Sequence, residues 1–333
     1  MIRIMLAGLV AGAMAVACKD ASDLSNDPDP IPTPDPSAQG CARTSVGLTP
    51  LSDLGRGSYR GELGGLYPGG VNVMPAPHLA AGLTIARGIE PLDVNGQPSP
   101  SGRYAFISIG MSNTTQEFST FVPMAVSDST RHPQLSVIDG AQGGQTAADW
   151  ANPNCQCWTV LDNRLRQANI SAQQVVAAWV KLADRQPTSG WPAYATTLKD
   201  STIVVLQRLK SRFPNFRLAY LSSRIYAGYA TTTLNPEPYA YESGFSMRWV
   251  IEQQLTGAAG MAYTGANAVA PWVAWGPYLW ADGLTPRSDG LTWSCSDLSS
   301  DGTHPSVSGR QKVAQRLLDF VRNDPTAREW YLR

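Results

Sequence analysis

The chain of 333 residues carries 26 Lys and Arg against 26 Asp and Glu, so its formal net charge is zero. Hydrophobic residues make up 43% of it and charged residues 16%, which supplies enough apolar surface for a core and excludes a disordered chain. No basic block is present, so neither nucleic acid nor an anionic membrane surface is expected as a partner.

The first 17 residues have the pattern of a signal peptide. Arg3 gives a positive start, and the apolar run over 4–17 is too short to span a bilayer as a mature helix. Ala15-Val16-Ala17 suits ordinary signal cleavage, whereas a small residue directly before Cys18 resembles a bacterial lipobox, in which Cys18 carries lipid. We expect an exported protein that meets the membrane only through a lipid anchor at the cell envelope, or one that is secreted if cleavage is ordinary.

A tether and a long irregular segment are predicted before the first strand. Residues 18–40 are rich in Asp, Ser and Pro, a composition that cannot bury apolar surface and behaves as an extended spacer. Residues 41–103 are rich in Gly and Pro, and we expect them to form an irregular N-terminal wrap. This wrap belongs to a single predicted domain over 41–333.

Beyond residue 103, short apolar runs alternate with longer amphipathic ones. The apolar runs predict buried strands at 104–109, 135–138, 174–180, 217–221 and 271–275. The amphipathic runs predict helices at 115–127, 159–169, 193–213, 241–256 and 306–322. Because the connections are long enough for crossover helices, the alternation predicts a three-layer α/β/α sandwich around a mostly parallel five-stranded sheet.

Four cysteines follow Cys18, and export would place them in an oxidising compartment. Cys41, Cys155, Cys157 and Cys295 can pair as two disulfides in three ways. A Cys155–Cys157 bridge would close a strained ring over one residue, so we expect each of these two to bridge outward, one to Cys41 and one to Cys295. No His stands at ligand spacing near them, and no metal site is predicted.

Polar residues follow the predicted strands, where the carboxyl ends of a parallel sheet place a site. Ser112 follows the first strand, Gly143 and Gly144 follow the second, and Asp301 precedes His304 by three residues before the last helix. Imidazole can take the proton of a serine hydroxyl near neutral pH, and a carboxylate on its other nitrogen holds the required tautomer. The pattern therefore predicts a nucleophilic serine site, with backbone N–H groups at the helix start and the glycines facing an oxyanion.

These residues and their order resemble the SGNH, or GDSL-like, hydrolases. Ile107-Ser-Ile-Gly-Met-Ser-Asn113 is similar to the nucleophile block, with Met where Asp is usual. Asp139-Gly-Ala-Gln-Gly143 is similar to the second block, and Asp301-Gly-Thr-His-Pro-Ser306 to the Asp-x-x-His block. The resemblance covers residues 104–320. It implies a flavodoxin-like sheet, a Ser112–His304–Asp301 mechanism, and oxyanion donors from the N–H groups of Ser112 and Gly143.

The third block departs from the pattern of that family. Gly-x-Asn is usual after the third strand, whereas residues 179–184 read Trp-Val-Lys-Leu-Ala-Asp. Lys181 falls nearest the missing Asn and would donate to the oxyanion from its ammonium group. Lys181 could instead be a solvated lysine at a strand end.

Substrate contacts are expected from five residues near these blocks, namely Asn113, Gly144, Arg224, Trp280 and Asp282. An aromatic face can pack on a sugar ring while Arg and Asp form hydrogen bonds. The predicted function is hydrolysis of ester groups, such as O-acetyl groups on polysaccharides, without a metal or organic cofactor. The alternative is a non-catalytic carbohydrate-binding protein on the same fold. Each site residue also has a simpler interpretation, in which Ser112 caps its helix, His304 is a surface loop residue and Gly143 only permits a turn.

Overall fold

The computed structural model describes residues 40–333, so the predicted signal peptide, Cys18 and all but the last residue of the tether lie outside the described residues. The strands are β1 (Ser58–Tyr59), β2 (Glu62–Leu63), β3 (Tyr104–Gly110), β4 (Leu135–Ile138), β5 (Val175–Lys181), β6 (Leu218–Leu221) and β7 (Trp272–Trp275). The α-helices are α1 (Leu51–Leu54), α2 (Ala76–Arg87), α3 (Ser112–Ser127), α4 (Ala147–Ala151), α5 (Gln156–Gln167), α6 (Ala193–Arg212), α7 (Tyr239–Leu255), α8 (Val307–Asn323) and α9 (Arg328–Tyr331).

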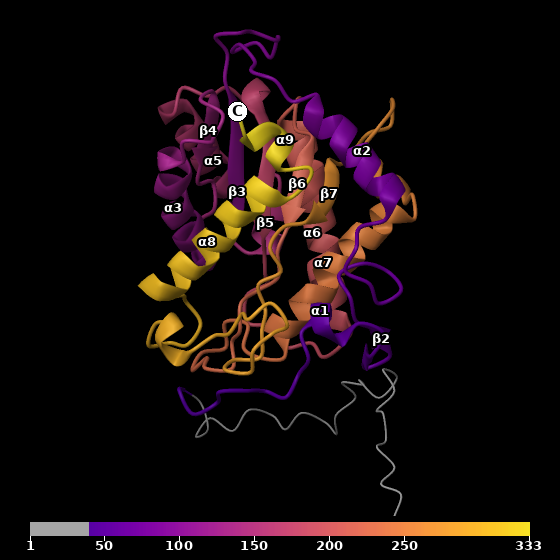
Figure 1. Ribbon diagram of the computed structural model, residues 1–333, viewed down its shortest axis with the longest axis vertical. Coiled ribbons are helices and arrows are strands. Elements are labelled where there is room, and N and C mark those ends of the chain that lie inside the picture. Colours follow the sequence, from indigo (N-terminus) through magenta and orange to yellow (C-terminus); the bar gives the residue numbers. More distant parts are fainter. Residues whose placement is uncertain (1–39) are drawn as a thin grey trace, which may run out of the picture.

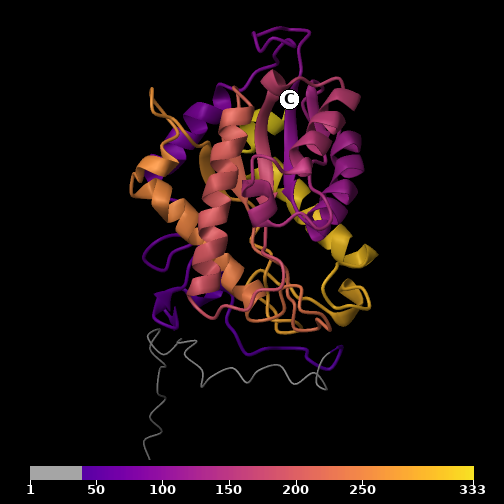
Figure 2. The ribbon, with the colours of Figure 1, turned by 180° about the vertical axis from the view of Figure 1, so that it is seen from behind.

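The main sheet has the order β4-β3-β5-β6-β7, and every neighbouring pair is parallel. Every residue of β3 and β5 is buried, as continuous apolar runs in the middle of a doubly covered sheet should be. One face carries α2, α3, α8 and α9 (Figure 1), and the opposite face carries α5, α6 and α7 (Figure 2). The predicted three-layer α/β/α sandwich is confirmed.

The segment before β3 is more regular than its composition suggests. It contains the β1–β2 hairpin and the 12-residue helix α2. Gly82 lets α2 approach the sheet, because a Cβ at this position would lie 2.4 Å from the ring of Trp272. Leu51, Leu54 and Tyr59 from the same segment are fully buried in the core. Within residues 40–333, no helix has the length and apolarity needed to cross a membrane.

The cysteines pair differently from the prediction. Cys41 is bonded to Cys295, and Cys155 is bonded to Cys157. The expectation that Cys155 and Cys157 each bridge outward is therefore wrong. It rested on the strain of a ring closed over one residue. Cys155 instead caps the start of α5 and has Cys157 in the first turn, with the Cα atoms 5.1 Å apart and within reach of each other.

The carboxylate of Asp128 joins the end of α3 to the last two helices. Its side chain is 1% exposed and accepts hydrogen bonds from Arg322 Nε at 2.8 Å and from the Tyr331 hydroxyl at 2.9 Å. The hydrogen bond from Arg322 is the main reason why the pKa of Asp128 lies below its usual range, in spite of its burial. Folding thus favours the ionised form of this carboxyl.

Replacing Asp128 by Asn is expected to lower the free energy of unfolding at pH 7 by about 2–4 kcal/mol, because buried hydrogen bonds to a charged group are lost. A carboxyl whose pKa is lowered by folding stabilises above its unfolded pKa and loses that effect as pH falls. The deficit should therefore shrink below about pH 4. Urea unfolding at several pH values measures it, with the exposed Asp319→Asn on α8 as the matched control. An equal deficit at pH 3 and pH 7 would contradict the assignment.

Candidate active site

Ser112 lies at the carboxyl edge of the sheet, as the first residue of α3 after β3. Gly110 makes the sharp passage between the two elements possible, because a Cβ there would lie 2.3 Å from the carbonyl oxygen of Lys181. Thr114 fixes the first turn of the helix by donating its hydroxyl to the same carbonyl at 2.8 Å. The half-buried Ser112 hydroxyl is therefore held where the helix start offers free N–H groups and a favourable dipole.

His304 lies on the loop between β7 and α8 and meets Ser112 across the edge of the sheet. The Ser112 Oγ atom is 2.8 Å from Nε2 of His304, and Nδ1 of His304 is 2.5 Å from Oδ2 of Asp301. The imidazole and carboxylate side chains are 25% and 30% exposed, so a ligand can reach the hydrogen-bonded Ser112, His304 and Asp301 side chains. The structure brings together the serine, imidazole and carboxylate that the sequence singled out.

The loop that carries Asp301 and His304 is held by its own hydrogen bonds. The second carboxylate oxygen of Asp301 accepts the backbone N–H groups of Thr303 and His304, both at 3.0 Å. Burial tends to raise the pKa of Asp301, but these bonds and the one from the imidazole together lower it. Asp301 therefore stays ionised around neutral pH and accepts from Nδ1, which leaves Nε2 free to receive a proton.

Gly143 lies beside Ser112 on the loop after β4. A Cβ built on Gly143 would be 3.9 Å from the Cβ of Ser112. The loop is fixed by the backbone bond from Gln142 N–H to the carbonyl of Gly110 at 3.0 Å and by Arg164, which donates to the carbonyls of Asp139 and Ala141. Within residues 40–333, the N–H groups of Ser112 and Gly143 donate to no protein acceptor. Both are available to a negatively charged oxygen next to the serine.

Lys181 does not complete this set of donors, and the prediction that it replaces the missing Asn is wrong. Its ammonium group is 1% exposed and lies 2.6 Å from each carboxylate oxygen of Glu117, which is itself fully buried on α3. Burial lowers the pKa of Lys181 to about 8 and raises that of Glu117, while the partner's charge opposes each shift. The ammonium group is bound in an internal ion pair under the helix.

Two of the five predicted substrate contacts are also wrong. The ring of Trp280 is completely buried, and its N–H donates to Glu237 at 2.8 Å. Asp282 is 3% exposed and accepts from the Ser45 hydroxyl at 2.5 Å and from the N–H of Val46 at 2.6 Å. Both side chains hold loops together and face no solvent.

The other three predicted contacts lie at or under the site in different roles. Asn113 is buried and donates to the carbonyl of Thr303 at 2.9 Å, which ties α3 to the loop of His304. Gly144 is exposed, and its carbonyl accepts from Arg185 at 2.6 Å. Arg224 is buried, and its Nε and Nη2 atoms have no hydrogen-bond partner in the described part of the chain. Asn113 and Arg224 are thus as buried as Trp280 and Asp282, and their prediction as substrate contacts is wrong as well. Of the five, only Gly144 is open to a ligand.

In the loop between β6 and α7, sequence reasoning singled out Arg224 but missed residues 231–233 as neighbours of the site. The N–H of Thr231 donates to the carbonyl of Asp301 at 3.0 Å, and the hydroxyls of Thr232 and Thr303 are 3.0 Å apart. The local signal, a run of three threonines at 231–233, is too common in loops to identify such a role. In the described chain, no three His, Cys, Asp or Glu side chains are arranged to hold a metal ion.

No family model matches the chain, and no curated protein matches it. Among solved structures, it is similar to a carbohydrate esterase family 3 protein from Talaromyces cellulolyticus, with 16% identity and a TM-score of 0.36 over 64% of this chain and 94% of the other. It is also similar to the periplasmic domain of a lipopolysaccharide acetyltransferase from Salmonella ser. Paratyphi A, with 14% identity and a TM-score of 0.36 over 73% and 95%. These values are too low to carry a functional argument.

Proposed function

We propose that the protein is a serine esterase of the SGNH type. The observation that carries the proposal is the hydrogen-bonded row of Ser112, His304 and Asp301 at the carboxyl edge of the sheet. An imidazole 2.8 Å from a serine hydroxyl, with a carboxylate on its far nitrogen, is the arrangement that activates serine as a nucleophile. The free N–H groups of Ser112 and Gly143 lie beside that hydroxyl and supply two oxyanion donors.

In the proposed reaction, the Oγ atom of Ser112 bonds to the ester carbonyl carbon while its proton passes to Nε2 of His304. The carbonyl electron pair moves onto oxygen, where the N–H groups of Ser112 and Gly143 stabilise the charge. When the intermediate collapses, the bond to the alcohol oxygen breaks, and His304 gives this oxygen the proton. Water then attacks the acyl-serine by the same route, the acid leaves, and Ser112 regains its proton.

We further propose that the protein is exported and acts on acyl groups of polysaccharides, with Cys18 as the lipid-anchored residue. The Cys41–Cys295 disulfide supports export, because such bonds persist in oxidising compartments. The alternative, a non-catalytic carbohydrate-binding protein, is favoured by one observation. The position of the missing Asn offers no replacement donor, since Lys181 is bound to Glu117.

Incubation with a fluorophosphonate and turnover of p-nitrophenyl acetate decide between the two functions. An esterase should hydrolyse the ester and gain one phosphonyl group, which peptide mass mapping should locate on Ser112. The matched control is Ser119→Ala, because this serine lies exposed on the same helix and should leave both results unchanged. An unlabelled Ser112 and turnover equal to that of Ser112→Ala would establish the non-catalytic alternative.

A further inference from the structure

Two tryptophans differ from the rest in their hydrogen bonding. All ten tryptophans of the chain lie within the described residues, and eight donate the indole N–H to a protein acceptor. Trp191 and Trp249 are the two that do not, and both are only partly buried. Neither indole nitrogen is among the buried unpartnered atoms of the described residues, so both N–H groups are open to a ligand although the rings also pack against the core.

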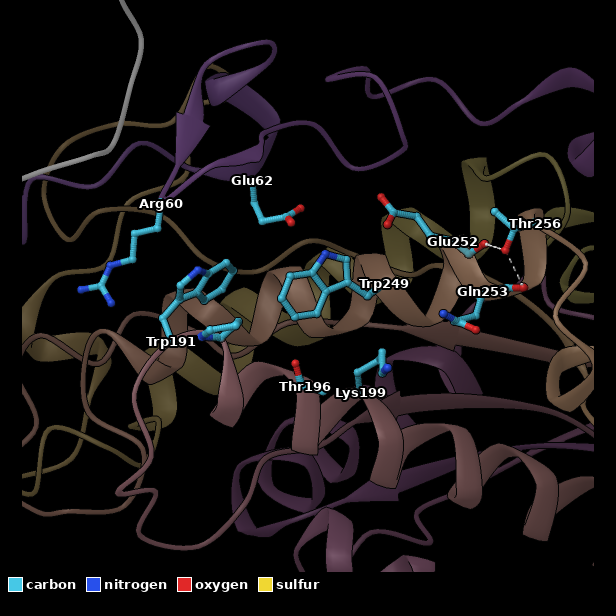
Figure 3. A pocket seen from close by; sticks show the side chains of 10 residues that line it. Arg60, Glu62, Trp191, Thr196, Lys199, Trp249, Glu252, Gln253 and Thr256 are labelled. Atoms are coloured by element: carbon cyan, nitrogen blue, oxygen red, sulfur yellow. Dashed lines mark hydrogen bonds between the residues drawn. The ribbon is translucent and has the colours of Figure 1, made fainter.

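Trp191 and Trp249 line the same cavity, which has a volume of about 680 Å³. In Figure 3 the two rings lie side by side, with Glu62 of the β1–β2 hairpin on one side and Lys199 of α6 on the other. The volume falls within the range of about 300–1,000 Å³ that is typical of small-molecule sites. A larger cavity of about 820 Å³, which includes Gln207, has no aromatic side chain in its lining.

The two rings form a rigid platform. Their centroids are 5.3 Å apart, and Trp191 also packs edge-on against Tyr59 and Phe245, each at 5.1 Å. Tyr59 and Phe245 are fully buried, so the core fixes the position of the exposed part of the platform. The two ring planes are tilted by 45° to each other, so the platform consists of two adjoining apolar faces rather than one flat surface. Faces that are fixed before a ligand arrives lose little conformational entropy on binding.

The charges around the platform balance. Arg60 and Lys199 contribute two positive charges to the lining, and Glu62 and Glu252 contribute two negative charges. Arg248 lies 2.9 Å from Glu62 and 3.0 Å from Glu252, so both carboxylates are held as fixed acceptors. A lining with aromatic faces, balanced charge and hydrogen-bonding groups of both kinds suits a neutral polyhydroxyl ligand better than a polyanion or a polycation.

A second cavity of about 520 Å³ adjoins the first on the side of the loop between β6 and α7. This cavity shares Arg60 and Trp191 with the first and extends to Thr231 and Thr232. Both threonines are hydrogen-bonded to the loop that carries Asp301 and His304. The two cavities adjoin at Arg60 and Trp191, and the second lies next to the loop of Asp301 and His304. We call the two adjoining cavities the groove; together they offer room for more than one sugar unit.

We propose that this groove binds a neutral glycan chain, with Trp191 and Trp249 as the stacking platform and with an ester-bearing sugar unit directed to Ser112. The glycan-binding part stands on the platform alone, whereas the position of the ester rests on the proposed esterase function. Sugar rings have apolar C–H faces that pack on indole rings, while their hydroxyl groups can bond Glu62, Glu252 and the free indole N–H groups.

Binding is tested with Ser112→Ala protein, so that turnover plays no part. Isothermal titration with neutral cello-, xylo-, manno- and malto-oligosaccharides of six units should give at least one Kd below about 1 mM. Oligogalacturonate and chitosan oligomers, the charged controls, should bind at least tenfold more weakly. Adding Trp249→Leu, which keeps apolar bulk but removes the flat ring, should weaken the best neutral ligand about tenfold or more. Gln207→Ala at the cavity without aromatics is the matched control, and no change is expected from it.

A second experiment tests whether the groove directs the ester to Ser112. It compares kcat/KM for an acetylated neutral polysaccharide with kcat/KM for p-nitrophenyl acetate. In Trp249→Leu, the ratio of kcat/KM for the polymer to that for the small ester should fall about tenfold, through KM. Trp191→Phe keeps an aromatic face, so this variant should fold normally and lose less of the ratio. The proposal is overturned if no neutral oligosaccharide binds, or if Trp249→Leu binds as well as its parent. Tryptophan-dependent binding without any ester turnover would support the glycan groove and overturn the esterase function alone.

Discussion

Ser112→Ala, His304→Ala and the double variant are expected to lose the same factor in kcat on p-nitrophenyl acetate, on the order of 10⁴-fold or more. The equality follows from the geometry, because Ser112 Oγ and His304 Nε2 are 2.8 Å apart and act on one proton. Without the base the hydroxyl is a poor nucleophile, and without the hydroxyl the base has nothing to activate. Steady-state kinetics on the three purified variants measure the effect.

Asp301→Asn is a further variant whose loss in kcat is compared with that of the two alanine variants. It should cost less than either deletion, because it misorients the imidazole but leaves the nucleophile and base in place. Circular dichroism must show that the variants fold, since Asp301 also accepts two backbone N–H groups of its own loop. Losses that multiply in the double variant would show that Ser112 and His304 act independently, and the proposed mechanism would then fail.

The strands and the proposed nucleophile were predictable because their signals are local. Each central strand is a continuous apolar run, and β3 and β5 are buried over their whole length. Asp301 and His304 are three residues apart on one short loop, so their pairing depends on few other residues. Ser112 follows from the rule that chemistry lies at the carboxyl ends of parallel strands.

The errors arise where burial is decided by distant segments. Asp282 looked like a ligand contact, but Ser45 and Val46, more than 230 residues earlier, cover it. Lys181 looked like a free strand-end lysine because its partner Glu117 lies 64 residues away on a helix. No pattern over neighbouring residues carries that information.

The same limit explains two features that sequence reasoning missed. The extent of helix α2 was not predicted, because Ala, Gly and Pro obscure its apolar face, which becomes recognisable only against Trp272. Trp191 and Trp249 come from separate elements 58 residues apart and form a platform only after folding. In each case the contact partner is distant in the sequence, so only the tertiary structure identifies it.

Lys181→Met is expected to lower the free energy of unfolding at pH 7 by about 3–5 kcal/mol, because it leaves the carboxylate of Glu117 buried without its partner. Glu117→Leu combined with Lys181→Met should recover most of this loss, since an apolar pair needs no compensation for desolvation. The exposed pair Arg87–Glu329 provides the matched control, and Arg87→Met should cost less than about 1 kcal/mol. Urea unfolding monitored by tryptophan fluorescence measures the free energy of unfolding of the parent, Lys181→Met, the double variant and Arg87→Met.

The pH dependence of Lys181→Met tests the cause of that loss. Burial already raises the pKa of Glu117, and removal of the ammonium group should raise it further. A carboxyl whose pKa is raised by folding destabilises above its unfolded pKa, and this effect fades as pH falls and the group is protonated in both states. The deficit relative to the parent should therefore shrink between pH 7 and about pH 4.

The double variant Glu117→Leu/Lys181→Met, once shown to be folded, tests whether the ion pair takes part in catalysis. Its kcat on p-nitrophenyl acetate should stay within a few-fold of the parent, whereas a 10²-fold fall in kcat at unchanged KM would contradict a purely structural role of the ion pair.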